Sequence, residues 1–175
     1  MDRPVSHLNS TSALDVAFVE RVAAELPRLA RIARLMTGDA HAADEVVAEA
    51  VARALPRWRA GEVNDLPAYL RRVLVNLVRR RWRRNALSRR RDHVGLDWLP
   101  VSDDPATAGA ERDRMLRAVA GLPPRRRAVV VLRFYDDLTE ERIATVLGIT
   151  VGTVKSTLSR ALEQLRADLG TLDVS

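Results

Sequence analysis

Residues 143–160 read Ile-Ala-Thr-Val-Leu-Gly-Ile-Thr-Val-Gly-Thr-Val-Lys-Ser-Thr-Leu-Ser-Arg, and this stretch predicts two short helices joined by a tight turn. Ile143 and Leu147 give the first helix an inward side. Gly148 supplies the left-handed residue of the turn, and Thr150 caps the second helix. A DNA-binding helix-turn-helix presents the start of its second helix to base edges in the major groove. The accessible residues there are Thr153, Lys155, Ser156, Ser159 and Arg160. An ordinary helical hairpin shares this pattern, so the stretch alone does not establish DNA binding.

The rest of the chain also follows the helical period, with no hairpin turn joining alternating segments. Pro27 is expected to open a helix, and Pro56 to end or kink one. Gly38 is expected to stop a helix and Asp39 to cap the next one. The expected helices span residues 14–25, 27–36, 40–55, 67 to at least 84, 111–120, 124–135, 140–147 and 151–168. These features predict an all-α fold.

One segment of different character divides the expected helices into two groups. Residues 92–110 contain four aspartates, two glycines, two prolines and no basic residue. We interpret this segment as an acidic linker between two small helical domains, at residues 13–91 and 111–170. Residues 1–12 are expected to form a flexible N-terminus.

The composition of the 175-residue chain excludes several classes of site. It has no cysteine, which removes disulfides, thiol catalysis and cysteine-ligated metals. His7, His41 and His93 are far apart in the sequence, so we expect no metal and no cofactor. The longest apolar run, residues 128–132, is far shorter than the roughly 18 residues that span a bilayer. Because residues 1–12 also lack the pattern of a signal peptide, we expect a cytoplasmic protein without membrane insertion.

The positive charge of the chain is concentrated in one window. Of the 29 basic residues 28 are arginine, and residues 71–91 contain ten arginines and no acidic residue. The remaining residues carry 19 basic against 23 acidic side chains, so the whole positive excess is local. A basic window on an otherwise acidic chain predicts a polyanionic partner, nucleic acid first and an anionic membrane second.

Helical geometry arranges this basic window into two stripes. At about 100° per residue, one stripe is apolar and forms the expected core side: Leu66, Leu70, Val73 and Leu77. A second stripe, here called the arginine stripe, consists of Arg72, Asn76, Arg79 and Arg83. Guanidiniums bind phosphates, whereas Asn and Tyr side chains can contact an unpaired base. Tyr69 borders the arginine stripe; Trp82 lies off both stripes and could stack on a base or pack in the core.

Together these segments resemble bacterial RNA polymerase sigma factors of the small, extracytoplasmic-function type. The sequence from Leu35 to Leu77 looks like region 2 of that family, and the sequence from Leu122 to Arg166 looks like region 4. The match covers roughly residues 14–169, with the two regions in the family's order. Its strongest element is Val-Gly-Thr-Val-Lys-Ser at 151–156, which follows an Ile-Ala-x-x-Leu-Gly helix.

The resemblance implies a role for each group of residues and no catalysis by the protein itself. Residues for the melted minus-ten strand are Asn64, Asp65, Tyr69, Arg72, Asn76, Arg79, Arg80, Trp82 and Arg83. Residues for the duplex minus-35 element are Thr153, Lys155, Ser156, Ser159 and Arg160. Residues for core RNA polymerase are Asp44, Glu45, Glu49 and Arg53, which would bind the clamp helices of its largest subunit. The implied partners also include the flap of the second-largest subunit and, as in many relatives, an anti-sigma factor.

Three other classes of protein share parts of this pattern. A helix-turn-helix regulator with a helical sensor domain would bind duplex operator DNA without being a polymerase subunit, but it would not need the arginine stripe. A recombinase would need a catalytic domain with strands, and none is predicted. A membrane-surface or ribosome-associated basic protein would explain the arginines but not the helix-turn-helix.

Overall fold

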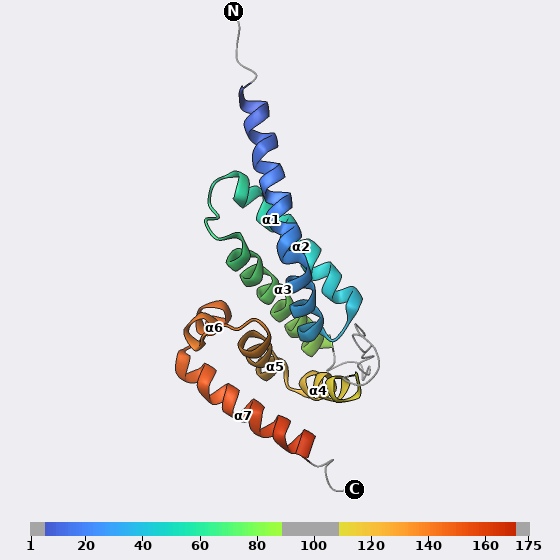
Figure 1. The fold of residues 1–175 in the computed structure, drawn as a ribbon. Coiled ribbons are helices and arrows are strands. Elements are labelled where there is room, and N and C mark those ends of the chain that lie inside the picture. Colours follow the sequence, from blue (N-terminus) through green and yellow to red (C-terminus); the bar gives the residue numbers. More distant parts are fainter. Residues whose placement is uncertain (1–5, 89–108, 171–175) are drawn as a thin grey trace, which may run out of the picture.

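The structure is a computed structural model that describes residues 6–88 and 109–170, with side chains described at 13–85 and 113–170. Within these ranges the chain forms seven α-helices, one π-helical turn and no strand, so the all-α prediction is confirmed. The N-terminal half contains α1 (Ser6–Thr37), α2 (Ala40–Arg59) and α3 (Leu66–Ser88) (Figure 1). The C-terminal half contains α4 (Gly109–Gly121), α5 (Pro124–Val130), the π-helical turn η1 (Val131–Tyr135), α6 (Glu140–Leu147) and α7 (Val151–Gly170).

The turns lie where the sequence predicts them. Gly38 has a positive φ of 71° and follows the end of α1, and the Asp39 side chain accepts a hydrogen bond of 2.5 Å from the backbone N–H of Ala42. Gly148 is left-handed, with φ 61°, between α6 and α7. The Thr150 hydroxyl accepts from the Thr153 N–H at 3.2 Å, which caps α7. Glycine and short polar side chains therefore end and begin these helices for the expected local reasons.

Pro27 does not open a helix and Pro56 does not end one, because each proline lies inside a continuous helix. Pro27 is within α1, where a helix start was expected, and Pro56 is within α2, which continues to Arg59. Both rings are exposed and so lie away from the packed side of their helix. The last turn of α2 is held from outside: the Trp58 indole donates to the Leu14 carbonyl at 3.1 Å, and Arg59 pairs with Asp15 at 2.6 Å. Tertiary contacts here outweigh the roughly 3 kcal/mol cost of an internal proline.

The expected bounds of the N-terminal segment and of the linker also differ from the structure. α1 begins at Ser6, inside the segment 1–12 that was expected to be flexible. α4 begins at Gly109, inside the expected linker 92–110. Residues 1–5, 89–108 and 171–175 lie outside the described residues, and with them most of that linker.

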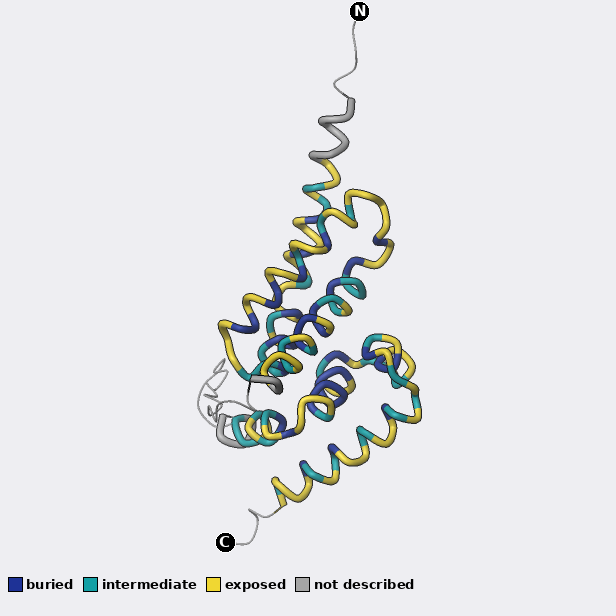
Figure 2. Tube along the Cα trace, turned by 180° about the vertical axis from the view of Figure 1, so that it is seen from behind, coloured by how far each residue is buried: buried dark blue, intermediate teal, exposed yellow. Residues whose placement is uncertain are grey.

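The two halves pack against each other and share one hydrophobic core. Buried residues of both halves belong to a single cluster (Figure 2). The central segment is residues 128–132, five consecutive apolar residues that are all buried. A helix that is apolar on every side must be covered on every side. Accordingly, α5 contacts α7 and α1, and η1 contacts α1 and α6; α6 in turn lies against α3.

Candidate nucleic-acid interface

The helix α3 is anchored by apolar side chains along its length. Of the four residues expected in the core, three are buried and one is half-buried: Leu66, Leu70 and Leu77, and Val73. Val75 and Val78 are also completely buried, although the sequence analysis did not place them in the core. They show that α3 is covered on a second side, where the C-terminal half packs. The helix is therefore a rigid support for the polar side chains it carries.

The arginine stripe lies between these two buried sides of α3. Arg72, Asn76 and Arg83 are exposed, as a strand-binding surface requires, whereas Arg79 is half-buried. The Arg79 guanidinium donates a hydrogen bond of 2.6 Å to the backbone carbonyl of Leu147, at the end of α6. The first half of the helix-turn-helix thus touches the arginine stripe directly.

Arg79 lies among other cations. Burial lowers its pKa, and the charges of Arg83 and Arg125 lower it further. Arg125 comes from α5, so the cationic cluster joins both halves of the chain. Like charges held together in this way favour the binding of an anion, which would relieve their repulsion.

The other residues predicted for the melted strand surround the arginine stripe. Asn64, Asp65 and Arg80 are exposed, whereas Tyr69 and Trp82 are half-buried and packed against the core. The Asp65 carboxylate accepts from the Ala68 N–H at 3.0 Å, so it also caps α3. The structure therefore brings all nine predicted residues to α3 and the loop before it, and it gives Tyr69 and Trp82 a packing role as well.

Two recesses lie on α3 where α6 and its neighbours pack over it. One recess, of about 270 Å³, is bounded by Asn64, Tyr69 and Arg72 on one side and by α6 on the other. The second, of about 280 Å³, is bounded by Arg79 and Trp82 opposite residues of α5 and the turn after α6. In this arrangement the C-terminal half contacts the arginine stripe at Arg79, whereas Arg72, Asn76 and Arg83 remain exposed.

The predicted duplex-reading residues of α7 lie on its outer side. Lys155, Ser156, Ser159 and Arg160 are exposed, and Thr153 is half-buried. Val154, Ala161 and Leu165 anchor the opposite side of the helix in the core. Lys155 is 3.7 Å from the Glu140 carboxylate of α6, and Ser159 donates to Glu163 at 3.0 Å. These contacts are on the surface and leave the start of α7 open to a partner.

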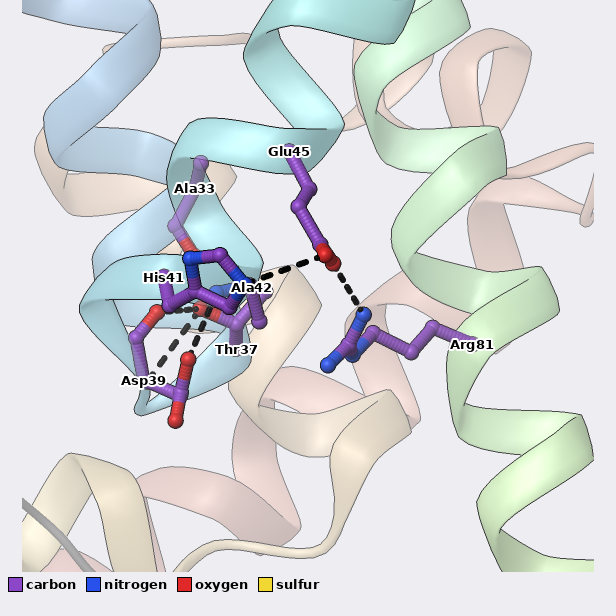
Figure 3. Close-up of polar contacts among 7 residues, drawn as sticks. All are labelled: Ala33, Thr37, Asp39, His41, Ala42, Glu45 and Arg81. Carbon is purple, nitrogen blue, oxygen red and sulfur yellow. Dashed lines mark hydrogen bonds and ion pairs between the residues drawn. The ribbon is translucent and has the colours of Figure 1, made fainter.

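The four residues assigned to polymerase binding are all exposed on α2: Asp44, Glu45, Glu49 and Arg53. Glu45 accepts from Arg81 of α3 at 2.9 Å and lies 3.3 Å from His41 Nε2 (Figure 3). Glu49 accepts from Arg53 at 2.5 Å. Exposed pairs of this kind contribute little stability, so they can be exchanged for contacts with another protein.

One ionic site joins the two halves and was not found in the sequence analysis. Asp136, which follows η1, has a fully buried side chain. Its Oδ1 lies 2.6 Å from Nε of Arg28 in α1, and its Oδ2 contacts Nε of Arg71 in α3. Both contacts are ion pairs between a buried carboxylate and a guanidinium. Burial raises the pKa of Asp136, and the charges of Arg71 and Arg28 oppose that effect.

Two classes of site find no support in the part of the chain that the structure describes. There, no group of three or more His, Asp or Glu side chains is placed to hold a metal ion. In the same residues, no helix has both the length and the apolar character needed to cross a bilayer.

Comparisons with known proteins match both halves of the chain. Residues 21–88 match the family model described as sigma-70 region 2, and residues 112–165 match the one described as sigma-70 region 4. The RNA polymerase sigma-E factor of Streptomyces coelicolor is 38% identical over 160 residues, which are 90% of this chain and 88% of that protein. The ECF RNA polymerase sigma factor SigL of Mycobacterium tuberculosis is 36% identical over 155 residues, 83% of this chain and 84% of that protein.

Two solved structures share the fold. The sigma factor RpoE, crystallised with the anti-sigma factor NepR from Bartonella quintana, matches with a TM-score of 0.73 and 24% identity. The match covers 88% of this chain and 97% of RpoE. CnrH, solved with the cytosolic domain of CnrY, matches with a TM-score of 0.63 and 24% identity, over 94% and 95% of the two chains.

Proposed function

This chain belongs to the sigma-70 family of RNA polymerase sigma factors, in its extracytoplasmic-function group, and we propose that it directs promoter-specific initiation by holding a melted minus-ten strand on α3 and reading a duplex minus-35 element with α7. As a member of that family it is a polymerase-binding sigma factor. In this proposal α3 contacts single-stranded DNA and α7 contacts duplex DNA.

One observation supports this division of work: the two halves carry two different sets of exposed side chains. The arginine stripe combines exposed guanidiniums with a carboxamide and nearby aromatic rings. That combination suits a single strand, because phosphates bind guanidiniums and unpaired bases stack on rings. The start of α7 instead offers short polar and basic side chains on an exposed helix, which suits base edges in a major groove.

The proposed partners follow from the same surfaces. The exposed acidic side of α2 is the proposed contact for the clamp helices of the polymerase's largest subunit, and the C-terminal half is proposed to meet the flap of the second-largest subunit. Because RpoE was crystallised with the anti-sigma factor NepR, we include an anti-sigma factor among the proposed partners. The proposed place of action is the cytoplasm, and the proposed role is regulatory, with all catalysis in the core polymerase.

Run-off transcription with purified bacterial core polymerase tests this function. The templates are a pool of upstream DNA fragments from the genome that encodes the protein. Specific transcripts only when both the protein and the core enzyme are present would support the proposal, and alignment of the start sites would yield both promoter elements. Tight binding of the protein alone to one duplex site, without stimulated transcription, would instead indicate a conventional helix-turn-helix regulator.

Replacing Lys155 or Arg160 by alanine is expected to weaken recognition of the minus-35 element. Removal of one base contact should cost about 1–3 kcal/mol of discrimination, or roughly five- to a hundredfold. Competition binding of the holoenzyme to promoters with intact and scrambled minus-35 elements measures the effect. Arg166→Ala is the matched control, since Arg166 is an exposed arginine further along α7. Unchanged selectivity in either variant would remove that residue from the proposed reading set.

A further inference from the structure

The loop between α2 and α3, residues 60–65, is hydrogen-bonded to the last turn of α2. The Gly61 N–H donates to the Trp58 carbonyl at 3.0 Å, and the Glu62 N–H donates to the Arg57 carbonyl at 3.0 Å. The Arg57 guanidinium also pairs with the Glu62 carboxylate. Gly61 has a φ of 70°, a left-handed position that favours glycine. The path of this α2–α3 loop therefore follows the position of the last turn of α2.

That last turn is held in its place by α1. The Arg59 guanidinium makes two hydrogen bonds to the Asp15 carboxylate, from Nε to Oδ1 at 2.8 Å and from Nη2 to Oδ2 at 2.6 Å. Two parallel bonds of this kind fix orientation as well as distance. The Trp58 indole donates to the Leu14 carbonyl, and its ring packs against Phe18. These contacts connect α1 to the turn from which the α2–α3 loop departs.

The end of α2 depends on these contacts because of Pro56. Proline has no backbone N–H, so the last turns of α2 lack one helical hydrogen bond. Leu14, Asp15 and Phe18 precede residue 21, at which the match to sigma-70 region 2 begins. The matched segment thus contains the proline and the loop, whereas the contacts that hold them come from earlier turns of α1.

The α2–α3 loop carries two of the residues proposed to bind the melted strand. Asn64 is exposed, whereas Val63 beside it is buried. Asp65 is also exposed, and its carboxylate accepts from the Ala68 N–H at the start of α3. The loop is therefore fixed to α2 at one end and to α3 at the other. A displacement of the last turn of α2 would move Asn64 relative to the arginine stripe.

We propose that α1 positions the α2–α3 loop for the melted minus-ten strand, through the Asp15–Arg59 pair and the Trp58 indole. The inference rests on the proposed function, because it concerns the same strand-binding surface. Asp15 and Arg59 are positioning residues: they set the place of Asn64 and need not contact DNA. Because a misplacement of about 1 Å can remove most of the effect of a binding group, loss of the pair is expected to alter base selection.

Charge reversal at the Asp15–Arg59 pair tests the anchoring of the loop in the full chain. Asp15→Arg and Arg59→Asp each place like charges at the contact, and the double variant restores opposite charges with their places exchanged. Hydrogen–deuterium exchange at the Gly61 and Glu62 amides reports whether the loop stays bonded to α2. Each single variant should raise these exchange rates at least about threefold, as suits a partly exposed pair, and the double variant should return toward the wild type. Glu20→Arg, the same reversal at another exposed residue of α1, is the matched control and should exchange like the wild type.

Base selection by the holoenzyme tests the consequence of this anchoring. The probe is promoter DNA whose minus-ten nontemplate strand is single-stranded, with each base of that element substituted in turn. Because the loop is short, Asp15→Arg should lower discrimination at least about threefold at one or two bases and leave the others unchanged. Binding to core polymerase should change much less. Trp58→Phe, which keeps a ring and removes the indole N–H, should act in the same direction, and circular dichroism confirms that the variants are folded.

The outcomes separate this inference from the proposed function. Unchanged exchange of the loop amides in both single variants would overturn the anchoring, as would a double variant that exchanges as fast as the single ones. Unchanged base selection, or an equal loss at every base, would overturn the positioning role. Failure of the proposed function would appear elsewhere, as absent run-off transcription by the wild type with core polymerase, and it would remove the DNA strand from the inference whatever the loop amides show.

Discussion

Replacing both Arg79 and Arg83 by alanine is expected to lower open-complex formation by the holoenzyme about a hundredfold or more. Each guanidinium is proposed to hold a phosphate of the melted strand, and a hydrogen bond to a charged group contributes about 1.5–3 kcal/mol. Two such bonds amount to about 3–6 kcal/mol, or a hundred- to ten-thousandfold. Binding to core polymerase, which we assign to α2, should fall much less. Arg83 lines a recess together with Glu45 and Glu49, but the ion pairs of these two carboxylates are with Arg81 and Arg53.

The measurement compares promoter melting with core binding over a range of salt concentrations. The slope of log affinity against log salt should become shallower by about 0.7 for each single-strand phosphate that is no longer bound. The control pair, Arg117→Ala with Arg166→Ala, removes the same charge from exposed positions of α4 and α7. Equal losses of melting and of core binding would contradict the division of roles between α2 and α3.

Arg79 has a second expected effect, on the packing of the two halves. It is bonded to the Leu147 carbonyl at the end of α6, so Arg79→Ala alone should also loosen the packing of α6 on α3. Arg83→Ala is expected to impair melting without this loosening, because Arg83 is exposed. Comparing the two single variants therefore separates the role of Arg79 in packing α6 against α3 from its proposed role on DNA.

Local features of the fold were predictable because their causes are local. Gly38 and Gly148 occupy left-handed positions that favour glycine, and Asp39 accepts from an N–H only three residues away. The short polar and basic residues at the start of α7 are exposed because the next turns bury Ala161 and Leu165. Each of these causes lies within a few residues of the feature it explains.

The prediction that Pro56 could end its helix failed because the contacts that hold the end of α2 are distant in sequence. Pro56 removes one backbone donor, yet the helix persists since Trp58 and Arg59 contact the first turns of α1, 44 residues away. Phe18 adds a ring contact to Trp58 at 6.1 Å between centroids. A rule based on the residue alone cannot include such tertiary contacts.

The junction between the halves was missed for the same reason. Arg28 and Asp136 are 108 residues apart, and no local pattern marks them as partners. One signal was present in the sequence: α3 has apolar residues outside its core stripe, at Val75 and Val78. A helix that is apolar on two sides needs two neighbours. The additional apolar side chains of Val75 and Val78 could have indicated that a second element packs on α3, although they do not indicate which helix it is.

Among the substitutions proposed for this protein, Leu74→Ala is expected to lower the free energy of unfolding the most. Leu74 is completely buried on α3, in the hydrophobic core that both halves share. Truncation of a buried leucine costs about 2–5 kcal/mol, from reduced burial and from the cavity left behind. Because a domain is typically stable by only about 5–15 kcal/mol, this loss is a large fraction of the total. Urea denaturation followed by circular dichroism measures the free energy of unfolding.

The same variant tests whether the buried side of α3 supports its DNA-binding side. Leu74 is not among the residues proposed to contact DNA. Any effect of the variant on promoter melting should therefore arise from a change in the position of α3. That effect should increase as the temperature approaches the unfolding transition. Val19→Ala is the matched control: Val19 is 63% exposed on α1, and its truncation should change stability by less than about 0.5 kcal/mol. A loss below about 1 kcal/mol for Leu74→Ala would place α3 outside the packed core. It would also remove the rigid support on which the proposed strand-binding surface depends.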